Sequence, residues 1–150
     1  MSTTPIDDFT LASTSGQDFN LSAAAKPLVI YFYPKDSTPG CTTESAAFRD
    51  LYPQFVAAGC GVIGISRDSI KSHQNFKAKL DLPFELISDP DETACALFDV
   101  MKMKNMYGKQ VRGVERSTFV IGTGNLILRE WRGVKVPGHA DEVLDFVNTL

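Results

Sequence analysis

The segment from Pro34 to Glu44 (Pro-Lys-Asp-Ser-Thr-Pro-Gly-Cys-Thr-Thr-Glu) concentrates the residue types of this chain that are suited to chemistry. The polar residues around Cys41 argue against a small hydrophobic residue buried for packing. The segment leaves an apolar strand and enters a predicted helix, so Cys41 falls in the first helical turn. Free backbone N–H groups and the helix dipole favour an anion there. We therefore predict that Cys41 is a thiolate nucleophile.

Groups that would assist such a thiolate lie in the same segment. Thr38 offers a hydroxyl, and the backbone amides of Gly40 and Cys41 can donate hydrogen bonds to a substrate oxygen. An arginine suits the stabilisation of a departing oxygen anion, because its guanidinium stays charged and addresses two oxygens. The residues alone do not choose among the several arginines of the chain. The charge of Glu44 suits a helix N-terminus but disfavours a nearby thiolate.

Other classes of cysteine chemistry find less support. A dithiol oxidoreductase of the thioredoxin type needs a second cysteine three residues on, where this chain has Glu44. A cysteine hydrolase needs a histidine base, and His73 and His139 are each expected on a helix surface or cap. Three cysteines and two histidines show no ligand spacing, so we predict no metal and no cofactor. The main alternative to an enzyme is a thioredoxin-like binding or redox-sensing module with an incidental Cys41.

The elements that must position Cys41 alternate between strands and helices. An apolar strand over 27–33 lacks polar alternation, which is typical of a strand buried on both faces. The helix after it is predicted over 41–58, with Thr38 as its cap and Pro39 suited to its first position. Further strands are expected at 62–66, 84–87, 117–121 and 126–131, further helices at 69–79, 92–98 and 139–150, and a short hairpin at 9–12 and 19–21. This order predicts an α/β, thioredoxin-like fold with a mixed central sheet flanked by helices and an N-terminal β-hairpin extension.

The length and composition fit one domain over residues 1–150. A formal net charge of −3, with scattered basic residues, shows no electrostatic footprint for nucleic acid. No apolar run is long enough for a membrane span, and residues 1–20 lack the apolar stretch of a signal peptide. Three irregularly spaced cysteines argue against a disulfide framework, so we expect a cytoplasmic protein. The apolar residues near 101–107 fit a dimer face, a lid or core equally well.

The pattern Pro34-xxx-Thr38-xx-Cys41 resembles the active-site motif of the peroxiredoxins. The longer run Phe-Tyr-Pro-Lys-Asp-x-Thr-Pro-Gly-Cys-Thr-x-Glu is close to the form of one branch, the bacterioferritin comigratory or Q-type peroxiredoxins. The similarity extends over nearly the whole chain, through 64–69 (Gly-Ile-Ser-Arg-Asp-Ser) and 116–121 (Arg-Ser-Thr-Phe-Val-Ile) to the final helix.

This resemblance implies an antioxidant enzyme, a thiol-dependent peroxidase that needs no cofactor. In the family, the cysteine matched by Cys41 attacks hydrogen peroxide or an organic hydroperoxide as a thiolate and becomes a sulfenic acid. The proline matched by Pro34 shields the site, and the threonine matched by Thr38 hydrogen-bonds the sulfur and the peroxide. The second arginine of the family's active site matches Arg116. Together with Gly40, these residues make up the predicted catalytic and substrate-binding set.

The chain departs from the family at the usual positions of a resolving cysteine, which here are Ala46 and Lys77. The remaining thiols, Cys60 and Cys95, are possible resolving residues, although their neighbours favour buried packing. We therefore expect a one-cysteine mechanism, in which an external thiol such as thioredoxin or glutaredoxin with glutathione reduces the sulfenic acid of Cys41. The expected oligomeric state is a monomer or weak dimer.

Overall fold

The computed structural model describes residues 5–150 and contains four α-helices and nine strands. The predicted absence of a signal peptide rests in part on residues 1–4, which lie outside the described residues. The helices are α1 (Pro39–Ala57), α2 (Ile70–Leu80), α3 (Thr93–Leu97) and α4 (His139–Val147). The strands are β1 (Thr10–Leu11), β2 (Phe19–Asn20), β3 (Leu28–Phe32), β4 (Gly61–Ser66), β5 (Leu86–Ser88), β6 (Met101–Met106), β7 (Lys109–Val114), β8 (Ser117–Gly122) and β9 (Leu126–Trp131).

Five strands form a mixed central sheet in the order β5-β4-β3-β8-β9. The pairs β3–β4 and β4–β5 are parallel, whereas β8 is antiparallel to both β3 and β9. All five residues of β3 are buried, in agreement with the apolar strand predicted at 27–33. The sequence prediction of an α/β protein with a mixed sheet is therefore confirmed.

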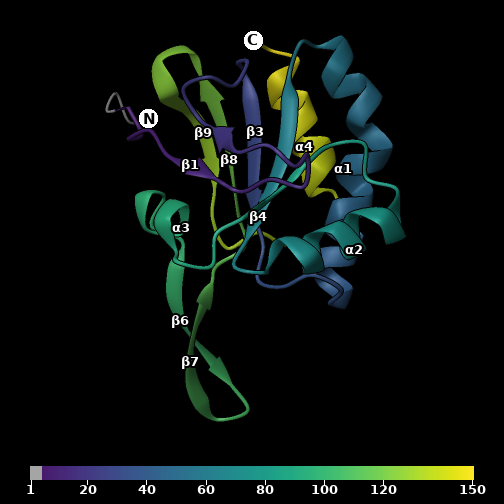
Figure 1. Cartoon of the computed structure of the whole chain (residues 1–150). Coiled ribbons are helices and arrows are strands. Elements are labelled where there is room, and N and C mark those ends of the chain that lie inside the picture. The colour runs from purple at the N-terminus through teal and green to yellow at the C-terminus, as the bar shows by residue number, and fades with distance from the viewer. Residues whose placement is uncertain (1–4) are drawn as a thin grey trace.

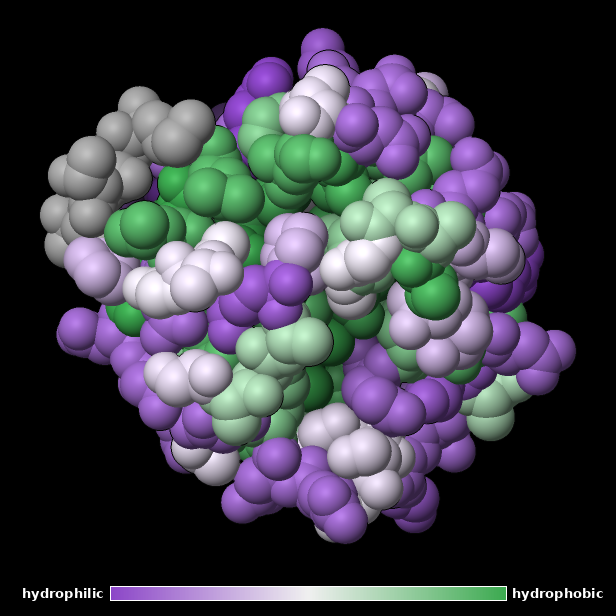
Figure 2. Space-filling model, turned by 90° about the horizontal axis from the view of Figure 1, so that it is seen from above, coloured by the Kyte–Doolittle hydropathy of each residue, from purple (hydrophilic) through white to green (hydrophobic). Residues whose placement is uncertain are grey.

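Each face of the sheet carries its own hydrophobic core. Successive residues of a strand point to opposite faces, so Val29 and Tyr31 of β3 pack on one side and Ile30 and Phe32 on the other. The first core is closed by α1, α2 and α4, and the second by α3 and the small β1–β2 hairpin (Figure 1). The predicted N-terminal hairpin is thus present as β1 and β2. In Figure 2, which views one end of the molecule, apolar residues gather toward the middle of the face within a mostly polar rim.

The hairpin of β6 and β7 is the element that the sequence analysis did not predict. Its strands pair with each other in antiparallel fashion, and it extends away from the central sheet (Figure 1). Met103, Met106 and Tyr107 are exposed, with 61%, 48% and 100% of their surface accessible. Of the three interpretations for the residues near 101–107, a core position is therefore wrong for these three, whereas Met101 is partly buried against the core.

Within residues 5–150, none of the helices combines the length and the apolar character that a membrane crossing requires.

Candidate active site

Cys41 is the third residue of α1, at the carboxyl end of the buried strand β3. The helix begins two residues earlier than predicted, because Pro39 occupies its first turn with a backbone angle already suited to a helix. The Cys41 side chain is 1% exposed. Pro34, which is partly buried, begins the loop that joins β3 to this helix. The sequence therefore placed Cys41 correctly in the first turn of a helix.

Arg116 reaches Cys41 because of the register between two strands. Ser117 of β8 pairs with Phe32 of β3, so the residue before β8 lies beside the exit of β3, where the loop to α1 starts. The Nη2 atom of Arg116 donates a hydrogen bond to Cys41 Sγ at 3.4 Å. Sequence reasoning called for an arginine without choosing one, and the arginine singled out by the resemblance is the one in contact with Cys41.

Glu44 completes a three-residue arrangement with Cys41 and Arg116. Its Oε1 accepts a hydrogen bond from Arg116 Nη1 at 2.6 Å, and its side chain is 1% exposed. Burial raises the pKa of Glu44 to about 7, against the opposing effect of Arg116. Burial also disfavours the charged guanidinium, but Glu44 and Cys41 outweigh it and raise the pKa of Arg116. The cation therefore persists between two acidic groups and can stabilise negative charge on sulfur and oxygen.

Thr38 is the N-cap residue of α1 by position, but its side chain does not cap the helix. Instead, its Oγ1 donates a hydrogen bond to the carbonyl oxygen of Lys35 at 2.7 Å. The predicted N-cap position of Thr38 is thus confirmed, but its hydroxyl oxygen accepts no hydrogen bond from the first turn of the helix. The oxygen of Thr38 keeps lone pairs that can accept a hydrogen bond from a substrate.

Gly40 allows the guanidinium of Arg116 to approach the helix. A Cβ atom at this position would lie 3.1 Å from Arg116 Nη2, which is closer than most side-chain contacts. The absence of a side chain at Gly40 therefore leaves the space in which Arg116 contacts Cys41. This is a packing role, in addition to the backbone donor that the sequence analysis assigned to Gly40.

Cys60 and Cys95 are both buried and lie apart from Cys41. Cys60 precedes β4 at the amino end of the parallel pair β3–β4, whereas Cys41 follows its carboxyl end. A five-residue strand spans roughly 13 Å, and a disulfide needs Cα atoms within about 7 Å. Cys95 belongs to the core on the other face of the sheet. Burial raises the pKa of both thiols, to about 11 for Cys60 and further for Cys95.

Both histidines are buried, so the predicted position on a helix surface is wrong for His73, whereas His139 does lie at the start of a helix, as the cap alternative predicted. His73 is fully buried within α2, and His139, at the first position of α4, is 6% exposed. His139 pairs with the hydroxyl of Thr118 at 2.8 Å, and burial lowers its pKa. Both ring nitrogens of His73 and the Nε2 of His139 lie at hydrogen-bond distance from nearby oxygens, which a helical pattern in the sequence does not reveal.

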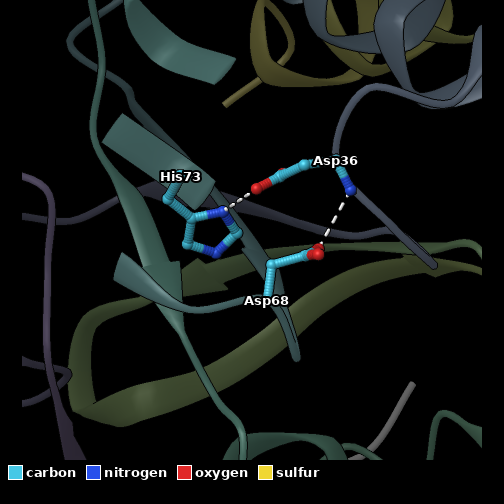
Figure 3. A group of neighbouring side chains, drawn as sticks. All are labelled: Asp36, Asp68 and His73. Carbon is cyan, nitrogen blue, oxygen red and sulfur yellow. Dashed lines mark hydrogen bonds and ion pairs between the residues drawn. The ribbon is translucent and has the colours of Figure 1, made fainter. Parts of the chain in front are cut away.

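Among the residues that the structure describes, Asp36, Asp68 and His73 form the one group with the spacing of a metal site (Figure 3). Their ligand atoms lie within 4.8 Å of one another. The same atoms take part in hydrogen bonds, from His73 Nδ1 to Asp36 Oδ2 at 2.7 Å and from the Asp36 backbone N–H to Asp68 Oδ2 at 2.9 Å. A cation would have to displace these contacts, so the group is better described as a hydrogen-bonded network.

Comparison with known proteins identifies the family. Residues 3–129 match the model of the AhpC/TSA family. Peroxiredoxin Bcp of Xanthomonas campestris is 56% identical over 138 residues, which cover 91% of this chain and 86% of that protein. The chain is a peroxiredoxin. Peroxiredoxin Bcp of Bacillus subtilis is 44% identical over 144 residues, with 95% of this chain and 92% of that protein covered.

Solved structures place this peroxiredoxin in the Q-type branch. The bacterioferritin comigratory protein of Xanthomonas campestris, studied for its alkyl peroxide reduction activity, superposes with a TM-score of 0.89 at 53% identity and covers 94% of this chain and 90% of its own. The Q-type peroxiredoxin of Xylella fastidiosa gives 0.90 at 45% identity, over 99% and 92% of the two chains. The predictions of a thioredoxin-like fold and a thiol-dependent peroxidase are confirmed. The peroxiredoxin is an enzyme that reduces peroxides at the expense of thiols.

Proposed function

We propose that Cys41 is the thiol of this peroxiredoxin that reacts with hydroperoxides, with Arg116 as its electrostatic partner. The contact between Arg116 and Cys41 Sγ at 3.4 Å is the observation that carries this assignment. A guanidinium in this position stabilises the thiolate and remains beside the oxygen that leaves. The other terminal nitrogen of the guanidinium, Nη1, donates to Glu44, so the cation stays directed at the sulfur throughout the reaction.

The first half of the reaction transfers one oxygen atom to sulfur. The Cys41 thiolate attacks the terminal oxygen of the hydroperoxide, so that a sulfur–oxygen bond forms while the oxygen–oxygen bond breaks. Sulfur gives up two electrons and becomes a sulfenic acid. The leaving oxygen departs as hydroxide or alkoxide beside Arg116 and takes up a proton, which yields water from hydrogen peroxide or an alcohol from an organic hydroperoxide.

The first turn of α1 and the preceding loop hold the substrate in line with the sulfur. The Thr38 oxygen accepts a hydrogen bond from the attacked O–H group, since its own proton is donated to Lys35. The backbone N–H groups at Gly40 and Cys41 face the substrate as donors at the start of the helix. Pro34 covers the thiolate from bulk water. Correct alignment of reacting atoms supplies a large part of such accelerations.

An external thiol completes the cycle. A reductant thiol displaces water from the sulfenic acid to give a mixed disulfide with Cys41, and a second thiol then releases the reduced enzyme. Cys60 lies at the opposite end of the parallel strands from Cys41, and Cys95 lies on the opposite face of the sheet. Both positions support this one-cysteine mechanism over an internal disulfide. The reductant is thioredoxin or glutaredoxin with glutathione, the enzyme acts in the cytoplasm as a monomer or weak dimer, and it uses no nucleic acid or membrane partner.

Intact-mass analysis tests this assignment directly. The reduced protein receives one equivalent of hydrogen peroxide in the presence of a sulfenic-acid trap, without added reductant. We expect one trap adduct on Cys41, and none in the Cys41→Ser variant, which should also lose turnover. The Cys60→Ser variant serves as the matched control and should react like the unmodified chain. A loss of two hydrogens without an adduct contradicts the one-cysteine mechanism, and consumption of peroxide by Cys41→Ser contradicts the assignment of Cys41.

A further inference from the structure

The loop between β3 and α1 contains a disfavoured backbone conformation directly before Thr38. Ser37 has a φ of +63°, in the left-handed region that residues other than glycine seldom adopt. Ser37 is also exposed, as is Lys35, so neither side chain buries surface that would hold the loop in place. A conformation of this kind persists only where its surroundings determine it. The restraint must therefore come from the one buried residue between them, Asp36.

Asp36 is held from four directions. Its backbone N–H donates to Asp68 Oδ2 at 2.9 Å. Its carboxylate accepts hydrogen bonds from Tyr33 Oη at 2.6 Å and from Ser72 Oγ at 2.8 Å. It also accepts one from His73 Nδ1 at 2.7 Å (Figure 3). The last two donors belong to α2, a helix separate from the loop and from α1. The carboxylate therefore ties the loop before Cys41 to a second helix.

His73 connects Asp36 to the central sheet. Its side chain is fully buried, and its Nε2 lies 3.0 Å from the carbonyl oxygen of Ile87 in β5. Both ring nitrogens thus face oxygen acceptors, the Asp36 carboxylate on one side and the sheet on the other. A polar ring without exposure is costly in an apolar core unless its partners are in place. The ring consequently sets the distance between the sheet and Asp36.

We propose that His73 is a positioning residue of the peroxidase reaction, because it fixes, through Asp36, the loop whose Lys35 carbonyl orients the Thr38 hydroxyl. The proposal rests on the role assigned to Thr38 above. The connection runs from Ile87 to His73, from His73 to Asp36, and along one peptide to the carbonyl that accepts the Thr38 proton at 2.7 Å. Loss of the His73 contact lets Ser37 relax and turns the Thr38 oxygen away from the substrate.

Two isosteric variants of His73 separate this role from simple packing. In His73→Asn, the amide nitrogen takes the place of Nδ1 and keeps the contact with Asp36. In His73→Gln, it takes the place of Nε2 and keeps only the contact with Ile87. The rate of the reduced protein with hydrogen peroxide, measured by stopped flow, is expected to fall about ten- to a hundredfold in His73→Gln and clearly less in His73→Asn. The rate of alkylation of Cys41 by iodoacetamide, which does not use Thr38, should stay unchanged in both.

Controls distinguish the proposal from damage to α2. Leu80→Val removes apolar volume from the far end of the same helix, away from Asp36 and its donors, and should leave the peroxide rate unchanged. Where His73→Gln does not fold, Asp36→Asn tests the same connection in a side chain of equal size. Equal peroxide rates in His73→Asn and His73→Gln, or a parallel loss of alkylation and peroxide rates, overturn the proposal.

A double-mutant cycle with Thr38→Val decides whether His73 acts through Thr38. If it does, adding His73→Gln to Thr38→Val causes little further loss, because the group that His73 positions is already absent. Multiplicative losses would mean that His73 acts independently and would refute its positioning role, while the assignment of Cys41 stands. A Thr38→Val variant with an unchanged rate would also remove the basis of the proposal, whereas the proposed function fails separately if Cys41→Ser still turns over peroxide.

Discussion

The buried carboxyl group of Glu44 makes a quantitative prediction about stability and pH. Its pKa is raised from 4.5 to about 7 in the folded protein, primarily by burial, and this rise corresponds to about 3 kcal/mol. Because the folded protein holds this proton to a higher pH than the unfolded chain, the contribution is complete below pH 4.5. It is lost as the pH rises through about 7 and stays constant above that value.

Glu44→Gln isolates this contribution. Glutamine has the same shape and keeps an oxygen to accept the hydrogen bond from Arg116 Nη1, but it carries no titrating proton. All other carboxyl groups titrate equally in both proteins and cancel in the difference. We expect the stability of Glu44→Gln, relative to the unmodified protein, to increase by about 3 kcal/mol between pH 4.5 and pH 8.

The assay is urea unfolding at several pH values between 4.5 and 8, followed by the fluorescence of Trp131, the one tryptophan of the chain. The free energy of unfolding in water is extrapolated at each pH for both proteins. Glu130→Gln, a variant of a carboxyl group with 41% side-chain exposure, serves as the control and should follow the unmodified protein. Parallel stability curves for Glu44→Gln and the unmodified protein would refute the argument that burial raises the pKa of Glu44.

Three further substitutions follow from the structure. Gly40→Ala should displace Arg116 by a few tenths of an ångström and slow the reaction with hydrogen peroxide severalfold in stopped flow; an unchanged rate would contradict this. Because alanine is the better helix former, the same substitution should keep the thermal stability or raise it by up to about 1 kcal/mol, measured by calorimetry. Cys95→Ala should lower the unfolding free energy by about 1 kcal/mol but leave the sulfenic-acid adduct on Cys41 and turnover with an external thiol intact; loss of turnover would show that Cys95 resolves the sulfenic acid. Asp81→Gly, at an exposed helix end with a φ of +52°, should stabilise the protein by about 0.5 to 1 kcal/mol; a lower midpoint in urea unfolding would contradict this.

Local signals were sufficient for the position of Cys41. An unbroken apolar run predicts β3, and Pro39 marks a helix start two residues before the cysteine. Both signals act over a few neighbouring residues, so the sequence carries them in full. Arg116 is different, because it lies 75 residues from Cys41 along the chain. Its proximity to Cys41 depends on how β8 pairs with β3. The resemblance to a family supplied that residue, and single-sequence reasoning did not.

The role of His73 was missed because helical periodicity gives the face of a residue but not its partners. His73 and Phe76 are three residues apart and are both buried on α2, which places the histidine on the apolar side of that helix. The acceptors of its two nitrogens come from residues 36 and 87. Such a network satisfies a polar group inside a core only after the sheet has formed.

The β6–β7 hairpin was missed for a reason of turn chemistry. Its two central residues, Tyr107 and Gly108, both have positive φ values, +53° and +78°. Two-residue turns of this kind usually carry asparagine or aspartate before glycine. Tyrosine rarely adopts this conformation, so the strongest short-range signal for a hairpin is absent here. The alternation of Met101 and Met103 with two lysines was left as the only indication of a strand.

The separation of this hairpin from the central sheet divides the stability of the molecule into two parts. Within the described residues, β6 and β7 pair with each other and with none of the five central strands. The hairpin can therefore open and close while β3 and its neighbours stay paired, so its amide hydrogens exchange with solvent at a lower free energy than those of β3. A protease that cuts near Tyr107 would then act on this partially open form, before the core around Cys41 unfolds.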